Sequence, residues 1–452
     1  MEQKKFTFLN RIFSVIVLLT ASVTYLLTIE PTASFWDCGE FIASSYKLEV
    51  GHAPGNPVFQ LIARFFTMFA SPEHAAMAVN IMSALCSAFT IFFLYLTIVH
   101  LGRRIIEKNG GNGVLSLGEG ISLIGAGTIG ALAYCWSDTF WFSAVEGEVY
   151  AMSSLFTAAV FWMILKWEEQ ADSEYADRWI VAIAFLMGLS IGVHLLNLLT
   201  IPAIAFVYYY KKASKVTTWG SIGVLLVSAV ILAVVLWGII PYLPKIAAVF
   251  DLLFVNVFHL PFNTGAAFFV IVLLVLSFLA VYLTYKKGSH IWNIITLCFT
   301  MIVIGYSAFA MVVIRSANNT PTNEGQPDNP YALVKYLGRE QYGSAPLLYG
   351  HTYASAYTDY KESTYHTKLE DRYIKAPSPI DVVYPSESKM FFPRMHSKDP
   401  SHIRFYETYT QGRGKVIPGS DYRMPTFGDN MKFFFDYQFN WMYMRYFMWN
   451  FA

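Results

Sequence analysis

The sequence predicts an all-α polytopic membrane protein that ends in a polar C-terminal region. Composition, long apolar runs and the distribution of charge all point to this fold class. The 452 residues are 55% hydrophobic and only 14% charged, whereas about 25% of the residues in a soluble domain are charged. The net charge is +1, and the sequence contains no long basic tract. We therefore expect a membrane-embedded chain with no nucleic-acid partner.

Run length and flanking charge indicate about nine membrane-spanning helices, since about 20 apolar residues cross a bilayer as a helix. Basic residues precede the first run as in a signal sequence, but no clear small-residue cleavage site follows, so we predict an uncleaved first helix. We expect Pro241 and Pro244 to end the seventh span, with a surface helix over 250–262. The predicted spans are 12–29, 77–100, 120–137, 149–166, 179–193, 196–210, 219–240, 266–285 and 291–313.

The charges between these spans agree with the proposed order. Cytoplasmic loops carry an excess of Lys and Arg. In the nine-span arrangement, every basic segment falls on one side and every acidic or nearly uncharged loop on the other, which predicts an N-in, C-out topology. The basic segments are the N-terminus, 101–119, 167–178, 211–218 and 286–290, and the opposite loops are 30–76, 138–148, the junction at 194 and 241–265.

A change in composition divides the chain into two predicted domains. Residues 1–315 form the transmembrane domain, and residues 316–452 form an extracytoplasmic region that is polar and rich in Pro and Tyr. For this second region, a small mixed α/β domain and a set of long packed loops are the two alternatives. The aromatic stretch 433–451 carries Asp436 and Arg445, so it fits the membrane interface better than a span. The abrupt end suggests the N-terminal part of a longer chain.

An acidic motif follows the first span, and the predicted site is built around it. Trp36-Asp37-Cys38-Gly39-Glu40 is continued by Gly51-His52-Ala53-Pro54-Gly55-Asn56-Pro57. Asp37 and Glu40 are three residues apart, so one helical turn presents both carboxylates on one face. Such carboxylates act as general bases or metal ligands. The structural alternative is a capping box, with Asp37 at the N-cap and Glu40 completing it.

Three further polar groups belong to the same predicted face of the membrane. Each has a structural alternative of its own: a first helical turn, an interfacial histidine, or an arginine at the end of a span. Because ionisable residues at membrane depth usually mark function, four such groups on one face favour a site there. The three groups are Glu146 and Glu148 with Tyr150; His194 with Asn197; and Arg315 with Asn318, Asn319, Glu324 and Asp328.

Sugar transfer from a lipid-linked phosphate to a hydroxyl would need such a set. A carboxylate can take the proton of the hydroxyl, and an arginine can stabilise the charge that grows on the leaving phosphate. A membrane-embedded donor would also account for the large apolar part of the chain. The residues thus suggest group transfer at the membrane surface.

One motif points elsewhere and is assigned to packing. Gly125-Ala126-Gly127-Thr128-Ile129-Gly130 matches the dinucleotide fingerprint G-x-G-x-x-G, but that fingerprint requires a preceding strand and a βαβ unit. Here it lies within an apolar run of 18 residues, where small residues allow helices to pack closely. Gly188 and Gly192 form a G-x-x-x-G motif of the same kind.

Four stretches together resemble the protein O-mannosyltransferase-like branch of the GT-C glycosyltransferases. They are the acidic motif, Gly51–Pro57, Glu146-Gly147-Glu148-Val149-Tyr150 and His194-Leu195-Leu196-Asn197. The resemblance covers roughly residues 10–330, and it is closest to a bacterial family of large membrane proteins. It implies a GT-C fold with its active site at the outer leaflet of the inner membrane, facing the periplasm. It also implies a polyprenyl-phosphate-linked sugar donor and a Ser/Thr acceptor on an exported protein.

The resemblance also implies roles for the site residues. Asp37 would be the catalytic base and Glu40 would orient Asp37 or the acceptor. Arg315 would hold the lipid phosphate, with Asn318 beside it. We expect no metal or other cofactor, although the four carboxylates could form a hard-cation site. The remaining predicted substrate-binding residues are His52, Glu146, Glu148, Tyr150, His194 and Asn197.

Three alternatives remain open at this point. The first is a GT-C transferase with a lipid or cell-wall glycan acceptor. The second is a transporter, although the sequence shows neither an internal repeat nor a polar group at mid-membrane. The third is a non-catalytic subunit of a protein-export complex. An exported acceptor also makes the secretion translocon a candidate partner, beside the membrane lipid itself.

Overall fold

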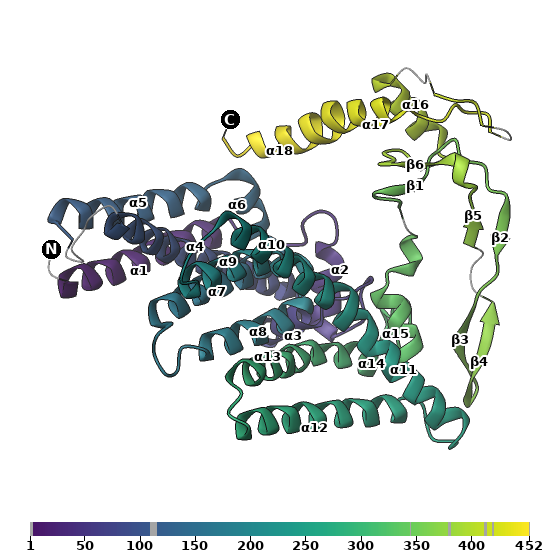
Figure 1. The fold of residues 1–452 in the computed structure, drawn as a ribbon, viewed down its shortest axis with the longest axis horizontal. Helices are drawn as coiled ribbons and strands as arrows, with labels where there is room; N and C mark the ends of the chain where they lie inside the picture. Colours follow the sequence, from purple (N-terminus) through teal and green to yellow (C-terminus); the bar gives the residue numbers. More distant parts are fainter. Residues whose placement is uncertain are drawn as a thin grey trace. The chain divides into compact units, whose positions relative to one another are not determined.

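The chain forms two compact units, Met1–Gly338 and Arg339–Ala452. We analysed a computed structural model that describes residues 3–108, 115–343, 345–377, 381–410, 414–417 and 420–451. The first unit is a bundle of helices (Figure 1), and the second combines helices with short strands. The predicted all-α polytopic class with a polar C-terminal region is confirmed, and the mixed α/β alternative is the one that the second unit adopts.

Within the described residues, seven helices are long and apolar enough to cross a membrane. The longest of them contain short 3-10 or π-helical segments. These seven are α1 (Gln3–Leu27), η1 with α4 (Pro72–His74, Ala75–Lys108), α5 (Leu117–Cys135), α7 (Val149–Gln170), α10 with η3 and α11 (Thr218–Ala233, Val234–Ile239, Ile240–Asn256), α12 (Thr264–Lys286), and α13 with η4 and α14 (His290–Tyr306, Ser307–Phe309, Ala310–Ala317).

The segments expected as the fifth and sixth spans form shorter helices, α8 (Arg178–Ile191) and α9 (Ile201–Lys212). A turn through Gly192 and His194 and the 3-10 helix η2 (Leu195–Thr200) separate them. At 1.5 Å per residue, the 14 residues of α8 extend only about 20 Å, against about 30 Å of hydrocarbon. Each is therefore shorter than a full span by itself.

The expectation that Pro241 and Pro244 end a span is wrong. The helix continues through both prolines to Asn256, so no separate surface helix covers 250–262. A π-helical stretch, Val234–Ile239, lies directly before them. Wider π turns change the hydrogen-bond partners, which lets a helix accommodate residues that lack a backbone N–H. Membrane helices tolerate proline where such local adjustments are available.

Glycines allow the helices to approach closely, as the sequence predicted. A Cβ atom at Gly188 in α8 would clash with the backbone of Ile302 in α13, and one at Gly305 would clash with the backbone of α8. The sequence Gly125–Gly130 lies inside α5, where Gly127 faces Tyr95 of α4. The strand and turn that a dinucleotide fingerprint needs are not formed there, so the motif serves packing.

Ion pairs gather the basic loops at one end of the first unit, which we call the basic end. Arg104 lies 3.2 Å from Glu168, Lys212 lies 3.5 Å from Asp172, and His290 lies 2.8 Å from Asp177. The loops after α1, α6 (Asp138–Ala144) and α8 meet at the other end, the acidic end, through α2 (Cys38–Lys47) and α3 (Pro57–Thr67). This grouping of the loops is the one that the charge pattern predicted.

The second unit has three separate two-stranded antiparallel ribbons among its described residues. Its core is an aromatic cluster in which Tyr353, Ile403, Tyr406 and Phe433 are buried. The strands pair as β1 (Tyr349–His351) with β6 (Lys389–Phe391), β2 (Asp359–Lys361) with β5 (Asp381–Val383), and β3 (Thr364–Leu369) with β4 (Arg372–Pro377). The helices are η5 (Glu340–Tyr342), η6 (Ser386–Ser388), α16 (Pro400–Tyr409), α17 (Phe427–Phe433), η7 (Phe434–Met444) and α18 (Arg445–Met448).

Candidate active site

Asp37 occupies the N-cap position of α2 but does not cap it. Its backbone is helical, and its side chain accepts no hydrogen bond from the first turn. The chain does form a capping box elsewhere, between Ser116 and Glu119 at the start of α5. At α2 the box is absent because Glu40 turns away to another partner. The capping alternative for Asp37 and Glu40 is therefore wrong, and the Asp37 carboxylate, with 58% of its side chain exposed, is open to a substrate.

The partner of Glu40 is His52, which the Gly51–Pro57 loop brings back over α2. The His52 Nδ1 atom lies 3.0 Å from Oε2 and 3.1 Å from Oε1 of Glu40, and the His52 backbone N–H donates to Oε1 at 2.5 Å. A Cβ atom at Gly51 would push the Glu40 carboxylate out of its present position, so a glycine here keeps room for the bonds between Glu40 and His52. The other ring nitrogen of His52, Nε2, lies 3.9 Å from Asp37 Oδ2.

These contacts shift the pKa values of both partners in opposite directions. The hydrogen bond to Glu40 raises the pKa of His52, more than burial lowers it. Burial alone would raise the pKa of Glu40, but its bonds from the His52 side chain and backbone outweigh burial, and the pKa of Glu40 falls. Both shifts favour the imidazolium–carboxylate form of the pair, whose ring lies beside Asp37.

The second loop contributes two buried carboxylates. Only 5% of Glu146 and 7% of Glu148 are exposed. The Cys38 thiol lies 3.7 Å from Glu146 and 3.9 Å from Glu148, which ties this loop to α2. Burial raises the pKa of Glu146, and burial together with the nearby Glu146 and Asp37 raises the pKa of Glu148 to about 7. The region beside Asp37 can therefore hold a proton on Glu148.

Glu148 also has a structural role, because it caps α7 by accepting a hydrogen bond from Val149 N at 3.2 Å. Between the two acids, Gly147 packs against Asn80 and Ile42 with no room for a side chain. Both Glu148 and Asp37 act electrostatically on Tyr150, so Tyr150 lies within reach of both loops. The structure brings Asp37, Glu40, His52, Glu146, Glu148 and Tyr150 together.

The third predicted group is only partly at this site. The ring of His194 lies 5.5 Å from the ring of Tyr150, and its Nδ1 accepts a bond from Leu196 N. Asn197 is fully buried, and its amide lies 3.2 Å from the sulfur of Met187 in α8. His194 therefore extends the site by one aromatic contact, whereas Asn197 packs within the helices, and its substrate-binding role stays a prediction.

Arg315 binds the far end of α2. Its Nε donates to the carbonyl of Leu48 at 2.6 Å and its Nη2 to the carbonyl of Lys47 at 3.0 Å. These are the orphan carbonyls at the C-terminus of α2, so Arg315 fixes the helix that carries Glu40. The neighbouring Asn318 donates to Ile314 O in its own helix, and its role towards substrate also stays a prediction.

Arg315 begins a longer segment, residues 315–336, that we call the strap. Val50 makes two backbone hydrogen bonds with the strap: its N–H donates to Thr322 O, and its carbonyl accepts from Glu324 N, each at 3.0 Å. On α15 (Pro330–Leu337), the buried Tyr336 donates its hydroxyl hydrogen bond to Gly51 O at 2.7 Å, with His52 O at 3.1 Å. The strap thus holds residues 47–52 in place.

Sequence reasoning did not find Tyr336. The chain has 29 tyrosines, and no local pattern distinguishes this one. Its role depends on contacts between residues more than 280 positions apart, which only the folded chain reveals. Glu324, which was predicted in the fourth group, does act electrostatically on His52.

Asp37, Glu40 and His52 have one ligand atom each within 4.8 Å of the others, the arrangement that a metal site requires. However, both ring nitrogens of His52 face carboxylates, Nδ1 towards Glu40 and Nε2 towards Asp37. A metal-bound histidine uses one nitrogen for the ion and donates the other to an outer group. Glu40 could be that outer group, so the arrangement fits a protonated ring between two carboxylates and equally a metal ion at Nε2.

A largely apolar groove of about 830 Å³ runs along α8, α9, α10 and α13. Ile191 and Leu198 line it towards the acidic end, and Lys212 and His290 line it towards the basic end. The end of the groove at Ile191 is close to the site, because the carbonyl of the next residue, Gly192, accepts a hydrogen bond from the N–H of Val58 in α3 at 2.8 Å. The groove therefore offers a largely apolar surface between the acidic and basic ends of the helices.

Fold and site together define a polytopic membrane protein whose ionisable site lies in the loops at one end of its spans. Residues 37–217 match the family described as "Protein O-mannosyl-transferase TMEM260 N-terminal domain". The resemblance of this part of the chain to a protein O-mannosyltransferase-like family, predicted from the sequence, is thus confirmed. The match begins at Asp37 and ends before Arg315 and Tyr336. Residues 343–435 match a family of unknown function, DUF8416.

Two curated relatives support the same assignment. Protein O-mannosyl-transferase tmem260 of Dictyostelium discoideum is 23% identical over 204 residues, which cover 43% of this chain and 22% of the relative. Protein O-mannosyl-transferase TMEM260 of Mus musculus is 25% identical over 178 residues, covering 39% and 23%. The aligned region thus spans less than a quarter of either relative.

Proposed function

We propose that this protein is a membrane glycosyltransferase that moves a sugar from a polyprenyl-phosphate-linked donor to Ser or Thr hydroxyls of exported proteins. The observation that carries the proposal is the open carboxylate of Asp37 beside the His52–Glu40 ion pair, in the segment that matches a protein O-mannosyltransferase family. A carboxylate at hydrogen-bond reach of a hydroxyl is a competent general base.

In this mechanism Asp37 takes the proton of the acceptor hydroxyl. The hydroxyl oxygen bonds to the anomeric carbon of the sugar, the bond from that carbon to the phosphate oxygen breaks, and its electron pair leaves with the polyprenyl phosphate. Glu40 holds the His52 ring with its Nε2 turned towards Asp37. Glu146, Glu148, Tyr150 and His194 line the space in which sugar and acceptor bind.

Two further features support a lipid-linked donor. The groove along α8, α9, α10 and α13 has the apolar lining that an isoprenoid chain needs. Arg315 uses two of its five N–H donors on Lys47 and Leu48 in the described structure, which leaves donors for the donor phosphate. Charge of this kind stabilises a leaving phosphate.

We place the site on the periplasmic side of the inner membrane. The support is the positive-inside rule, because Lys and Arg gather at the basic end. An acceptor would then reach the site as it leaves the membrane, so the secretion translocon is a reasonable partner. Copurification of the two in mild detergent is expected, and its failure would count against this partner.

Replacement of Asp37 tests the function directly. Asp37→Asn keeps size and hydrogen bonding but removes the base. We expect the rate of sugar transfer to fall by about 10²- to 10⁴-fold, so that exported proteins lose glycan and the lipid-linked sugar accumulates. Asp138→Asn is the matched control, an exposed acid at the start of α6, and should retain activity.

Other outcomes discriminate the alternatives. Unchanged glycosylation in Asp37→Asn would overturn the catalytic assignment and favour a transporter or an accessory subunit of an export complex. Loss of a lipid or cell-wall glycan, with protein glycan intact, would keep the chemistry but change the acceptor.

A further inference from the structure

The last described helical run, Phe427–Met448, is anchored to the second unit only by its first turns. A capping box between Thr426 and Asp429 begins it. Phe433 is 3% exposed and packs on Tyr406, with ring centroids 4.8 Å apart. Tyr437 packs on Phe405 at 4.8 Å. The start of the run is therefore part of the core.

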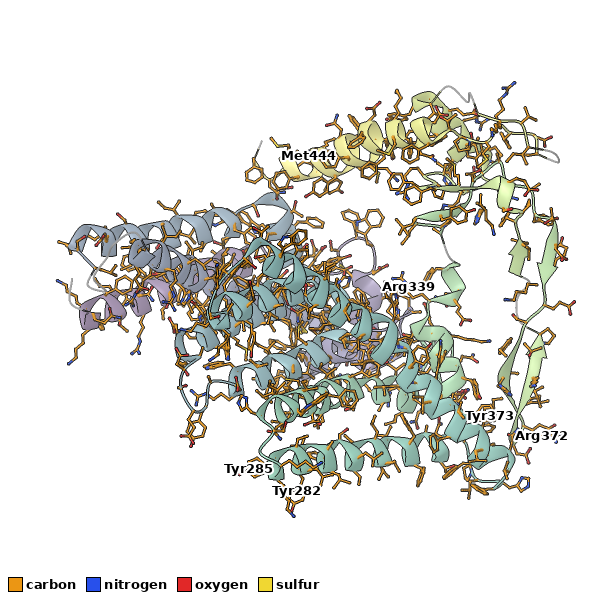
Figure 2. The ribbon with its side chains drawn as sticks, in the orientation of Figure 1. Tyr282, Tyr285, Arg339, Arg372, Tyr373 and Met444 are labelled. Atoms are coloured by element: carbon orange, nitrogen blue, oxygen red, sulfur yellow. The ribbon has the colours of Figure 1, made fainter. Side chains whose placement is uncertain are left out.

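Beyond Tyr437 the same helix exposes large apolar side chains almost continuously. Nine of these residues are between 44% and 70% exposed, and Figure 2 shows side chains projecting from the helix around the labelled Met444. Soluble proteins rarely leave contiguous apolar patches of this kind uncovered. The nine are Phe439, Trp441, Met442, Tyr443, Tyr446, Phe447, Met448, Trp449 and Phe451.

Two rows run along this exposed part. One is an aromatic ladder with centroid distances of 5.2 to 6.4 Å between successive rings: Phe435, Phe439, Tyr443, Phe447 and Phe451. In the other, the guanidinium of Arg445 lies 4.3 Å from the ring of Trp441 and 5.2 Å from that of Trp449. Residues two apart on a helix do not face each other, so the two rows lie on different faces.

We propose that residues 438–451 lie in the interface of a phospholipid bilayer, with the aromatic ladder towards the acyl chains and Arg445 on a lipid phosphate. Trp and Tyr favour the headgroup level, and Arg445 is the one charged residue among 437–451, complementary to an anionic headgroup. At the 1.5 Å rise of an α-helix the 14 residues extend at most about 20 Å, and those up to Met444 are π-helical. The segment is therefore too short to span about 30 Å of hydrocarbon but long enough to lie along the surface.

A bilayer is a natural occupant because, among its described residues, the first unit of the same chain has seven helices able to cross a membrane. A second copy of the chain fits less well as the occupant. One partner helix would cover one row and leave the other in water, whereas an interface solvates both, apolar chains on one side and headgroups on the other. This inference rests on the membrane location alone and not on the proposed sugar transfer.

Photo-crosslinking of the full chain in phospholipid nanodiscs tests whether residues 438–451 lie in the bilayer interface. A benzophenone amino acid replaces Phe447, Leu347 or Ile271 in turn. Leu347 is the matched control, 74% exposed in the same unit, and Ile271, 62% exposed in the spanning helix α12, is the positive control. Mass spectrometry should find phospholipid adducts at 447 and 271 and few at 347.

Adducts at 447 no more frequent than at 347, with 271 positive, would overturn the proposal, as would covalent chain dimers through 447. With anionic phosphatidylglycerol in the disc, Arg445→Gln should lower the yield at 447 severalfold. Lys432→Gln should leave it unchanged, because Lys432 is paired with Asp436 at 3.0 Å in the anchored part. Equal yields in both variants would overturn the headgroup contact.

Discussion

Both carboxylate oxygens of Glu40 face the Nδ1 atom of His52, at 3.0 and 3.1 Å, and the same imidazole turns its Nε2 towards Asp37. A residue that could have completed a capping box is thus bound to a histidine from another loop. This ion pair gives Asp37 a fixed positive neighbour, and it makes the stability of the acidic end depend on pH.

His52→Gln should destabilise the protein most in the pH window between the lowered pKa of Glu40 and the raised pKa of His52. The contribution of His52 is full below its unfolded pKa of about 6.5 and is lost as pH rises through its raised folded pKa. The contribution of Glu40 is lost as pH falls through its lowered folded pKa.

Thermal unfolding in detergent across pH measures this effect. Within the window we expect a loss of about 1–3 kcal/mol, shrinking at high and low pH. His74→Gln, an exposed histidine in the short helix η1, should show no such window. A loss that stays constant across pH would contradict the ion pair.

Glu148→Gln should stabilise the protein at alkaline pH. The pKa of Glu148 is about 7 in the folded chain because of burial, against about 4.3 when unfolded. The folded state therefore binds more protons between these values, and its stability falls as pH rises through them. A neutral Gln removes that cost, which is on the order of 3 kcal/mol above pH 7.

The measurement is the difference in unfolding temperature between variant and parent at pH 5 and pH 8. The difference should be clearly larger at pH 8. Glu119→Gln, at an exposed helix start outside the site, serves as the control. A difference that does not depend on pH would show that burial does not raise the pKa of Glu148 in the folded chain.

Tyr336→Phe should lower transfer activity while the chain stays folded. The variant loses only the hydroxyl that donates to the carbonyls of Gly51 and His52, at a stability cost of about 1 kcal/mol. Because His52 then loses its support, the pH profile of transfer should change along with the rate. Tyr342→Phe, on an exposed tyrosine nearby in sequence, is the control. An unchanged profile would leave Tyr336 with a purely structural role.

Treatment with EDTA should leave transfer unchanged if His52 holds a proton between Asp37 and Glu40. The ring nitrogens that would bind an ion already face carboxylates. The assay compares the chelated enzyme with the same sample after addition of Mn²⁺ or Mg²⁺. Loss of activity with EDTA and its recovery with one of these ions would replace the ion pair with a metal site.

Much of this architecture was readable from sequence because apolar run length and basic flanks report directly on lipid. The acidic motif, His52 and the Glu146–Glu148 pair were found because ionisable groups are conspicuous in an apolar chain. The sequence does not decide between two local structures where their free energies are similar. Helix continuation through Pro241 relies on a π-helical segment, and a capping box at Asp37 competes with the bond from Glu40 to His52.

The strap has a consequence for how the protein is made. Tyr336 and Arg315 close contacts with residues more than 260 positions earlier, after every span of the first unit has been synthesised. Because distant contacts form only after the intervening chain is ordered, the loop that carries His52 lacks the contacts of the strap until that segment has been synthesised. An unfinished chain, with α1 to α13 already inserted, would hold Asp37 in the membrane without its aligned partner. The strap thus delays assembly of the site until biogenesis of the helical unit is complete.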